Sequence, residues 1–383
     1  MGRWHPASPM IQARGGRFTA TVLQDGHVLV SGGIVSVAGS FQTLSSVEIY
    51  DPATDTWAPT VSMTTPRSRH SATLLPDGRV LVSGDRLTNR GPTLASAQVF
   101  DPGAGTWTRV DDMGDPRDNF RAVLLMDGTV LVSGGASDVP PFVTDAAEVF
   151  DPATKSWHPI GSLHVARFYH LMTLLKDGRV LVAGGALPPP LHLTTRTAEI
   201  YDPKTGKWNP IGAMAERRYS HLAQILPDGD VLVAGDSTAQ DNPSPAALAS
   251  AEVFDVRTGR WRSGPALIAA RGFIPYASSL LADGQLFVSV GIAGPHRPGA
   301  LIRRDAQLDE RNMVSSSVDE SGPSGSPGGA LVRWVGPRHR RIGRSRGSVH
   351  RPGFGGTVHD MTIGSLQTLG ASATSAKYFH ASL

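Results

Sequence analysis

Residues 72–84 read ATLLPDGRVLVSG and decide the fold of this 383-residue chain. Two short apolar runs flank an Asp-Gly pair, a pattern that predicts strand, tight turn and strand. An Asp-Gly pair suits a type I′ hairpin turn, which needs positive φ at both central residues. The second run is apolar almost throughout, as expected for a strand covered on both faces. The pair recurs at Asp25, Asp77, Asp127, Asp177, Asp228 and Asp283.

Three further markers repeat in register with these hairpins. Each hairpin is followed by a loop and a segment such as EVFDP, then by a tryptophan six residues after the aspartate. An arginine follows ten residues after each tryptophan. The segments begin at Glu48, Gln98, Glu148, Glu199 and Glu252; the tryptophans are Trp57, Trp107, Trp157, Trp208 and Trp261; the arginines are Arg67, Arg117, Arg167, Arg218 and Arg271. Such a period of about fifty residues indicates a repeat architecture.

The repeat resembles the kelch family, whose unit carries a Gly-Gly, an aromatic residue and a tryptophan at these places. The resemblance covers residues 4–291 and implies an all-β propeller like the central domain of galactose oxidase, and the count of repeats predicts six blades. Each blade would be four-stranded and antiparallel, with ATLL innermost and the Trp strand outermost. We assign residues 2–305 to the propeller, with repeats near 11–62, 63–112, 113–162, 163–213, 214–266 and 267–305.

The N-terminus predicts how the ring closes. Trp4, Met10 and Arg14 keep the offsets of Trp57, Met63 and Arg67, so residues 2–9 read as an isolated outermost strand. The sixth repeat lacks its own tryptophan, and we expect this strand to complete its blade and leave no open sheet edge. A chain that has lost upstream sequence is the alternative.

The C-terminal part carries no repeat marker. Residues 300–305 could supply the third strand of the sixth blade, although they lack its aromatic residue. Residues 306–383 are rich in Ser, Gly, Pro and Arg, and we expect a poorly ordered tail. An out-of-frame continuation of the gene is one explanation for the abrupt end of the repeat.

Composition narrows the possible chemistry. The chain has no cysteine, which excludes disulfides, thiolate metal sites and cysteine nucleophiles, and leaves the compartment open. No apolar run is long enough to span a membrane, and residues 1–10 contain no secretory signal core. The net charge of +3 gives no argument for nucleic acid. The basic stretch 333–351 is the one segment that could bind it electrostatically. Ligand identity, oligomeric state and whether six or seven blades close the ring stay open.

Side chains that recur in every repeat are interpreted as scaffold. We expect the repeated arginine to pair with the glutamate of the third strand or with carbonyls of a neighbouring blade. His70, His170 and His221 share a position that is Phe18, Phe120 or Tyr276 in the other repeats. A position that accepts Phe or Tyr is a packing position, so we expect no metal site there.

Copper radical oxidases share the kelch fold, so the resemblance makes this class of enzyme a candidate function. Resemblance to them would imply copper held by two histidines and two tyrosines, one cross-linked to a cysteine. Without cysteine that cofactor cannot form, and no Gly-x-Ser-x-Gly elbow or carboxylate pair appears. We therefore predict no cofactor, no metal and no assigned catalytic residue. A loop-assembled carbohydrate-active enzyme, of epimerase or lyase type, stays as the alternative function.

A binding site is expected where equivalent positions differ between repeats. The position eight residues before each Asp-Gly aspartate is the clearest case, near the channel mouth: Arg17, Arg69, Asn119, Tyr169, Ser220 and Pro275. Arginine forks and an aromatic face suit a carboxylate-bearing peptide or a sugar. The loops after the Gly pair, which include Phe41 and residues 188–190, also vary. Asp85 and Asp236 replace the second glycine of the Gly pair in two repeats. These two isolated carboxylates are weak evidence for a cation-binding site. We predict a non-catalytic module that binds a protein, a peptide or a carbohydrate at this mouth.

Overall fold

A computed structural model of the chain describes residues 7–37, 40–84, 86–87, 91–188, 193–235 and 248–267. Beyond residue 267 it describes the backbone of six short strands. Every regular element described is a strand, so no described helix is long and apolar enough to cross a membrane. The all-β class predicted from the repeat is confirmed.

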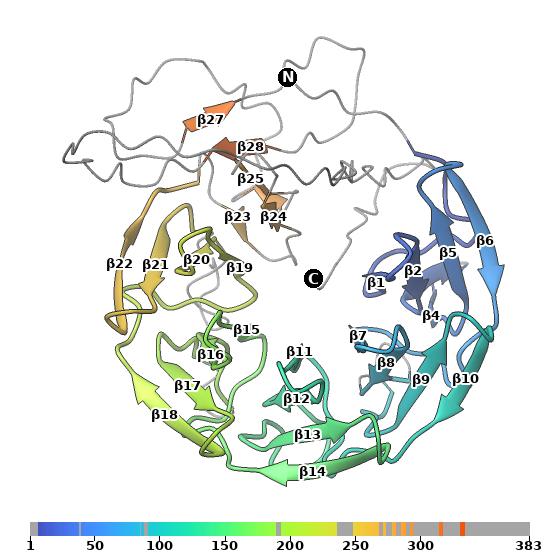
Figure 1. Ribbon diagram of the computed structural model, residues 1–383, viewed down its shortest axis with the longest axis horizontal. Helices are drawn as coiled ribbons and strands as arrows, with labels where there is room; N and C mark the ends of the chain where they lie inside the picture. Colours follow the sequence, from blue (N-terminus) through green and yellow to red (C-terminus); the bar gives the residue numbers. More distant parts are fainter. Residues whose placement is uncertain are drawn as a thin grey trace, which may run out of the picture.

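Five four-stranded antiparallel sheets stand like blades around a central opening (Figure 1). From the innermost strand outward they are β1 (Thr19–Val22), β2 (Val28–Ser31), β5 (Val47–Asp51) and β6 (Thr56–Thr60); β7 (Ser71–Leu74), β8 (Val80–Ser83), β9 (Ala97–Asp101) and β10 (Thr106–Arg109); β11 (Arg121–Leu124), β12 (Val130–Ser133), β13 (Ala147–Asp151) and β14 (Ser156–Ile160); β15 (Leu171–Leu174), β16 (Val180–Ala183), β17 (Ala198–Asp202) and β18 (Lys207–Ile211); and β19 (Leu222–Ile225), β20 (Val231–Ala234), β21 (Ala251–Asp255) and β22 (Arg260–Gly264).

The second strand of each blade forms the core between neighbouring blades. All four residues of β8, β12, β16 and β20 are buried, as the unbroken apolar runs predicted. Side chains from adjacent sheets meet there; Leu125 and Leu131 of the third blade pack in one cluster with Val180 and Val182 of the fourth. This contact between sheets keeps the inner strands close to one another and so fixes the shape of the channel.

The hairpin turns differ from the predicted type I′. In the second blade Gly78 N donates to Leu75 O at 3.0 Å, so Pro76 and Asp77 are the central residues of the turn. Only the glycine of each described Asp-Gly pair has positive φ, +86° at Gly78. This is a three-residue loop in which a left-handed glycine follows the turn. The aspartate instead caps the loop: Asp77 Oδ1 accepts from Arg79 N at 3.0 Å.

A sixth four-stranded antiparallel sheet completes the set. Its strands, from the inside outward, are β24 (Ser278–Leu280), β25 (Gln285–Val288), β28 (Ala330–Arg333) and β27 (Val314–Ser316), and β24 contacts β19 of the fifth blade. A two-stranded sheet pairs β23 (Arg271–Gly272) with β26 (Ile292–Ala293). Six sheets are what the repeat predicted. The two outer strands, however, come from beyond residue 305, where we had expected only tail.

In this sheet β27 is the outer described strand, and the expected closure by the N-terminal strand is a prediction that the described residues do not test. Residues 2–6 of that strand, residues 300–305 and the rest of the tail lie outside the described residues. The described end of the N-terminal segment nevertheless docks as predicted. In three blades the tryptophan donates its Nε1–H to a backbone carbonyl that lies four residues after the tryptophan of the preceding blade; these are Trp107, Trp157 and Trp261. Trp57 does the same with Ser8 O, which lies four residues after Trp4.

The repeated arginines are structural. Arg14, Arg67, Arg117, Arg167 and Arg218 are at most 1% exposed. Each donates Nη1–H to two backbone carbonyls; for Arg117 these are Gly134 O and Ala146 O, both at 3.0 Å. Arg14, Arg117, Arg167 and Arg218 also pair with the third-strand glutamate, as predicted. The carbonyls belong to the arginine's own repeat and not to a neighbouring blade.

The second blade departs from this pattern at Gln98. Its Oε1 accepts from Thr64 N, whereas its buried Nε2 finds no partner among the described residues. Replacing Gln98 by glutamate restores the carboxylate that the other four blades place beside their arginine. We expect Gln98→Glu to raise the free energy of unfolding by about 1 kcal/mol. Urea unfolding measures this. Gln42→Glu, at an exposed glutamine of residues 40–43, is the control for added charge alone, and a destabilised Gln98→Glu variant would contradict the assignment.

Candidate functional site

The five described candidate residues occupy one structural position, just before the innermost strand of each blade. Arg17, Arg69, Asn119, Tyr169 and Ser220 are all half-buried and all left-handed, with φ between 51° and 63°. Left-handed backbone costs an ordinary residue on the order of 1 kcal/mol and persists only where its surroundings enforce it. The repeat therefore keeps an unusual backbone at this position while the side chain changes.

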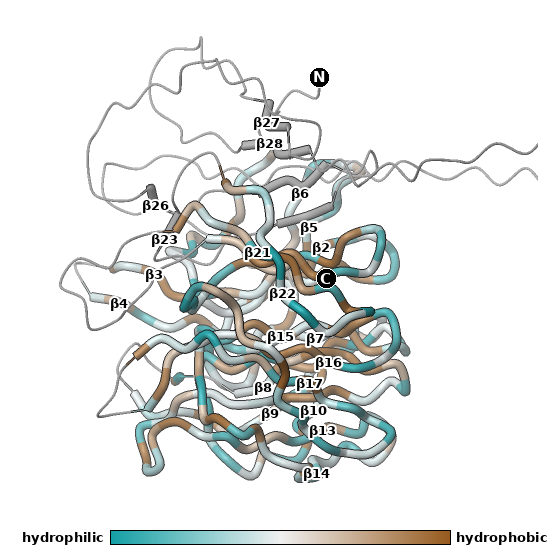
Figure 2. Tube along the Cα trace, turned by 90° about the vertical axis from the view of Figure 1, so that its left-hand side faces the viewer, coloured by the Kyte–Doolittle hydropathy of each residue, from teal (hydrophilic) through white to brown (hydrophobic). Residues whose placement is uncertain are grey.

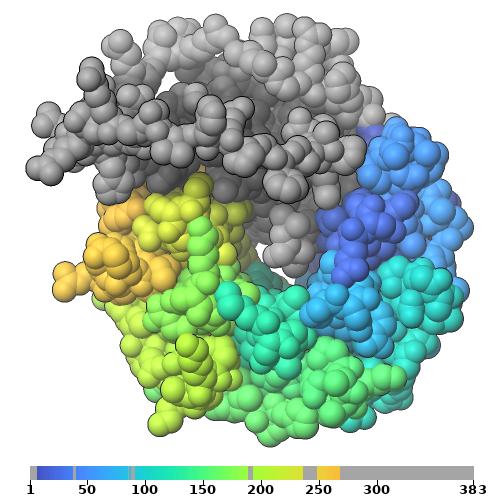
Figure 3. Space-filling model, in the orientation of Figure 1, coloured from blue at the N-terminus to red at the C-terminus, as the bar shows by residue number. Residues whose placement is uncertain are grey.

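Hydrogen bonds between blades join these positions in two groups, which the contact between β7 and β11 brings side by side. Arg69 N donates to Arg17 O at 2.8 Å, Tyr169 N to Asn119 O at 3.0 Å, and Ser220 N to Tyr169 O at 2.8 Å. The candidates therefore follow one another around one end of the central channel, which is open to view between the described blades (Figure 3). We call this set the channel mouth. Pro275, the sixth equivalent, lies outside the described residues.

The buried carboxylate of Asp118 contacts the arginine side chains on one side of the mouth. Asp118 is 1% exposed and pairs with Arg86, and its Oδ2 lies 3.9 Å from Nη1 of Arg69. Asn119 Nδ2 donates to Asp118 Oδ1 at 3.0 Å. Asp118 thus fixes two arginines and an amide from two adjacent blades. Our sequence reasoning missed both Asp118 and Arg86. The residues one position before the candidates also differ between repeats. Asp118 occupies this position in the third repeat, where the other repeats have Gly16, Ser68, Phe168 and Tyr219, so the same comparison would have found it.

Aromatic side chains form the next sector of the mouth. The ring of Tyr169 lies 5.1 Å from that of Phe168 and 6.1 Å from that of Tyr219, all tilted relative to one another. Tyr219 is 6% exposed, whereas Tyr169 is half-buried. Tyr169 is therefore an aromatic side chain supported from both sides, next around the ring from the polar group at Asp118.

The loops after the Gly pair rise beside the mouth. Ile34 N donates to Gly16 O at 3.0 Å, and Ala136 bridges Asp118. From there the hairpin of β3 (Ile34–Val37) and β4 (Ser40–Thr43) projects from the sheet (Figure 2). Phe41 on this hairpin is 56% exposed and Phe142 in the third blade is 47% exposed. Asp85, Asp236, residues 189–192 of the fourth blade's loop and most of the fifth blade's loop lie outside the described residues.

The histidines pack against glycine, as the sequence predicted. A Cβ on Gly184 would lie 2.7 Å from Cε1 of His221, and Gly184 has φ +64°. Gly32 and Gly134 cradle His70 and His170 in the same way. Burial lowers the pKa of His70 and His221 to about 3 and lowers that of His170 well below its ordinary value. All three are neutral at physiological pH. Among the described residues, no group of three His, Cys, Asp or Glu side chains could hold a metal ion.

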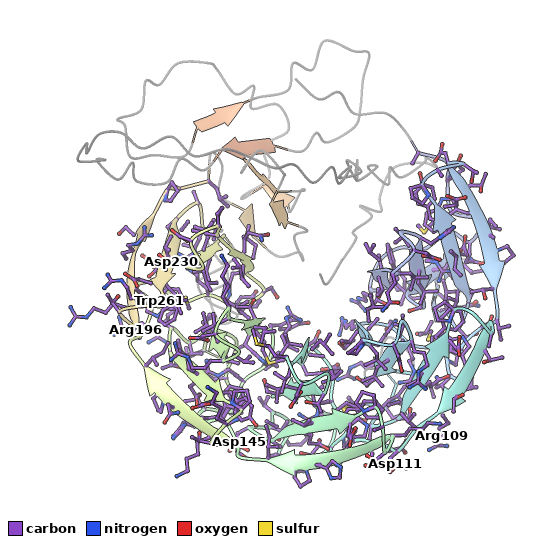
Figure 4. All side chains as sticks on the ribbon, viewed as in Figure 1. Arg109, Asp111, Asp145, Arg196, Asp230 and Trp261 are labelled. Atoms are coloured by element: carbon purple, nitrogen blue, oxygen red, sulfur yellow. The ribbon has the colours of Figure 1, made fainter. Side chains whose placement is uncertain are left out.

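Two shallow hollows on the surface do not involve the mouth residues. One of about 430 Å³ is lined by Arg196, Ala215, Glu216 and Arg217. The other, of about 450 Å³, is lined by residues 109–112 and Trp157. Figure 4 places Arg109 and Asp111 at the outer rim of the ring, far from the opening.

Comparison with known proteins agrees with this geometry. The Kelch motif matches residues 16–64 and 175–215, within the first and fourth blades. The chain is a kelch-repeat β-propeller. No curated protein matches its sequence.

Two of the solved structures that match this chain show a similar fold. One is a fungal alcohol oxidase of the AA5 family in complex with copper, with 19% identity and a TM-score of 0.58. That match covers 73% of this chain, which spans only 59% of the oxidase. The other is YjhT, with 14% identity, a TM-score of 0.57 and coverage of 76% of this chain and 93% of YjhT. At these identities the likeness shows the fold alone.

The copper centre of kelch-type radical oxidases does not fit this propeller. Such a centre needs a cysteine, and this chain has none. In the part of the chain that the structure describes, no cluster of metal-binding side chains replaces it. We therefore route no chemistry of this protein through copper.

Proposed function

We propose that this kelch propeller is a recognition module, without catalysis of its own, whose ligand lies across the channel mouth. The observation that carries the proposal is the set of five equivalent left-handed residues with differing side chains. A purely structural position repeats its side chain, as the buried arginines do. Here the backbone repeats and the chemistry changes, as in a rigid scaffold that presents a recognition surface.

The chemistry of the mouth favours a ligand with both a polar or anionic part and a flat apolar part. Arg17 and Arg69 lie in adjacent blades, and their guanidinium groups can form forked hydrogen bonds to a carboxylate. The face of Tyr169 can stack on a sugar ring or an aromatic side chain. A carbohydrate or a short acidic peptide has this combination. The raised apolar residues Phe41 and Phe142 would add contact to a larger partner.

Replacing both mouth arginines, Arg17→Ala with Arg69→Ala, should weaken binding at least tenfold. Hydrogen bonds to a charged group contribute about 1.5–3 kcal/mol each, and two are removed. The full chain is first screened on an array of neutral glycans, acidic glycans and acidic peptides. The strongest hit is then titrated by calorimetry. Arg86 still pairs with Asp118 in the double variant, so that carboxylate keeps a partner.

Arg109→Ala is the matched control, because Arg109 is an exposed arginine with an ion pair at the outer rim. It should bind like the wild type. Equal affinity of all three proteins for the hit would move recognition away from the mouth.

A carbohydrate-active enzyme is the second candidate, and one observation favours it. Both ring nitrogens of His221 lack a partner among the described residues, so they could face a ligand, although a pKa lowered to about 3 makes the ring a weak base. Its 7% exposure opposes the idea. To decide between a binding module and an enzyme, an array hit is incubated with a small amount of the protein, and nuclear magnetic resonance follows whether the hit is converted. An epimerised or eliminated product that disappears with His221→Phe would establish the enzyme.

A further inference from the structure

Arg121 is exceptional among the residues of the innermost strands. It is the first residue of β11, paired across the hairpin with Ser133 of β12. The equivalent first residues of the other four described blades are Thr19, Ser71, Leu171 and Leu222. On the innermost strands β1, β7, β11, β15 and β19, no other residue is charged.

The fold places Arg121 beside the channel, because β11 is the innermost strand of the third blade and borders the central opening (Figure 1). Its positive charge is one cause of the lowered pKa of His170 in the fourth blade and of His221 in the fifth. The fourth blade stands between the third and the fifth, so a side chain from β11 can lie close to both histidines only on the channel side. Because Arg121 follows Asn119 by two residues, it lies directly beneath the mouth.

No carboxylate compensates this charge within the described part of the chain. Arg121 donates Nη1–H to Phe120 O at 3.3 Å and forms no ion pair there. Arg117, four residues earlier, pairs with Glu148 and lies near Asp115. Burial lowers the pKa of Arg121, and Tyr169 is the group that opposes this shift. An arginine nevertheless stays protonated in proteins, so the channel holds a positive charge that a ligand can neutralise.

We propose that Arg121 anchors an anion site in the channel, which receives a carboxylate of the ligand recognised at the mouth. This inference rests on the proposed function, because the ligand enters through the mouth. The planar fork of Arg121 matches a carboxylate with two parallel hydrogen bonds. The adjacent Tyr169 offers a hydroxyl donor and a ring face.

A carboxylate fits this site better than a phosphate. Arg121 supplies a single positive charge, and its neighbours His170 and His221 are neutral because their pKa values are lowered. Leu171 and Leu222 occupy the equivalent positions of the next two blades. A doubly charged phosphate would leave one charge without compensation in this setting, whereas a carboxylate would be matched.

Two matched pairs of small probes test the site on the full chain. D-glucuronate is compared with D-glucose for a sugar carboxylate, and N-acetylglutamate amide with N-acetylglutamine amide for a peptide carboxylate. In at least one pair, wild type should bind the carboxylate at least tenfold tighter than its neutral twin, in line with one strong charged hydrogen-bond pair. Arg121→Gln should bind both members equally, and Arg121→Lys should keep part of the preference. Arg109→Gln is the matched control and should keep all of it. A preference that survives intact in Arg121→Gln, or its absence from wild type in both pairs, overturns the site.

Stability without ligand gives an independent readout. Because Arg121 is an uncompensated charge, Arg121→Gln should raise the melting temperature by about 2 °C. A structural arginine would lower it, and a lowered melting temperature overturns the assignment. The mouth is tested separately: a double variant Arg17→Ala, Arg69→Ala that binds normally while Arg121→Gln loses its carboxylate preference would refute the mouth and leave the channel site standing.

Discussion

Replacing Arg167 by alanine is expected to lower the free energy of unfolding by about 4 kcal/mol. The guanidinium is fully buried and donates to Gly184 O at 2.9 Å, Thr197 O at 3.0 Å and Glu199 Oε1 at 2.9 Å. Alanine leaves two carbonyls without this donor and leaves the buried carboxylate of Glu199 without its main partner. Removing one member of a buried ion pair typically costs 3–5 kcal/mol for this reason.

Urea unfolding of the full chain measures the change. Arg179→Ala is the matched control, because Arg179 pairs with Asp177 on the surface with side-chain exposures of 37% and 42%. An exposed pair of this kind contributes about 0–1 kcal/mol. If Arg167→Ala does not fold, the double variant Arg167→Met, Glu199→Leu removes both charges and should recover most of the stability. Similar losses for Arg167→Ala and Arg179→Ala would contradict the structural role of the repeated arginine.

Acid is expected to destabilise the propeller strongly through its buried histidines. Their folded pKa values are lowered, to about 3 for His70 and His221, whereas an unfolded histidine titrates near 6.5. Below pH 6.5 the unfolded chain therefore binds protons that the folded chain does not. The stability gained from keeping each ring neutral is complete above pH 6.5 and is lost as the pH falls toward 3. Each histidine contributes a slope of about 1.4 kcal/mol per pH unit, so three together reach about 4 kcal/mol per unit.

The variant His221→Phe isolates one of these contributions. Phe18 and Phe120 occupy the same position in two other blades, so the ring should be accepted. We expect the free energy of unfolding, measured with urea between pH 6 and pH 4, to fall less steeply with pH in the variant than in wild type. The difference in slope should be about 1.4 kcal/mol per pH unit, which is the contribution of one proton. At neutral pH the variant should be at least as stable, since both nitrogens of His221 lack partners among the described residues. Identical slopes for the two proteins would show that His221 is protonated in the folded state.

The repeat allowed much of this structure to be predicted because its markers have local causes. The apolar run at Val80 to Ser83 must be covered on both faces, and the tryptophan offset fixes the outer strand. The turn type was wrong because an Asp-Gly pair fits both the predicted turn and the three-residue loop observed at Gly78. The outer strands β27 and β28 were missed because they pair with each other and with β25 over long sequence separations without any repeat marker.

The candidate site was predictable as a position but not as a set of contacts. Comparing equivalent columns of the repeat located Arg17, Arg69, Asn119, Tyr169 and Ser220 at one end of the channel. Asp118 and Arg86 pair across two blades, and Arg121 acts on histidines of two other blades. Such relations depend on how the blades pack around the axis, which no local pattern records. The sequence offered one indication of Arg121: it is a charged residue at a repeat position where the other described blades have Thr, Ser or Leu.

Hydrogen–deuterium exchange of the full chain, with and without a saturating array hit, tests the location of recognition most directly. The mouth residues come from five separated segments, so a ligand across the mouth should slow exchange in peptides covering residues 17, 69, 119, 169 and 220 together. Protection restricted to the outer strands that carry Trp57, Trp107 and Trp157, with none at the mouth segments, would contradict the account.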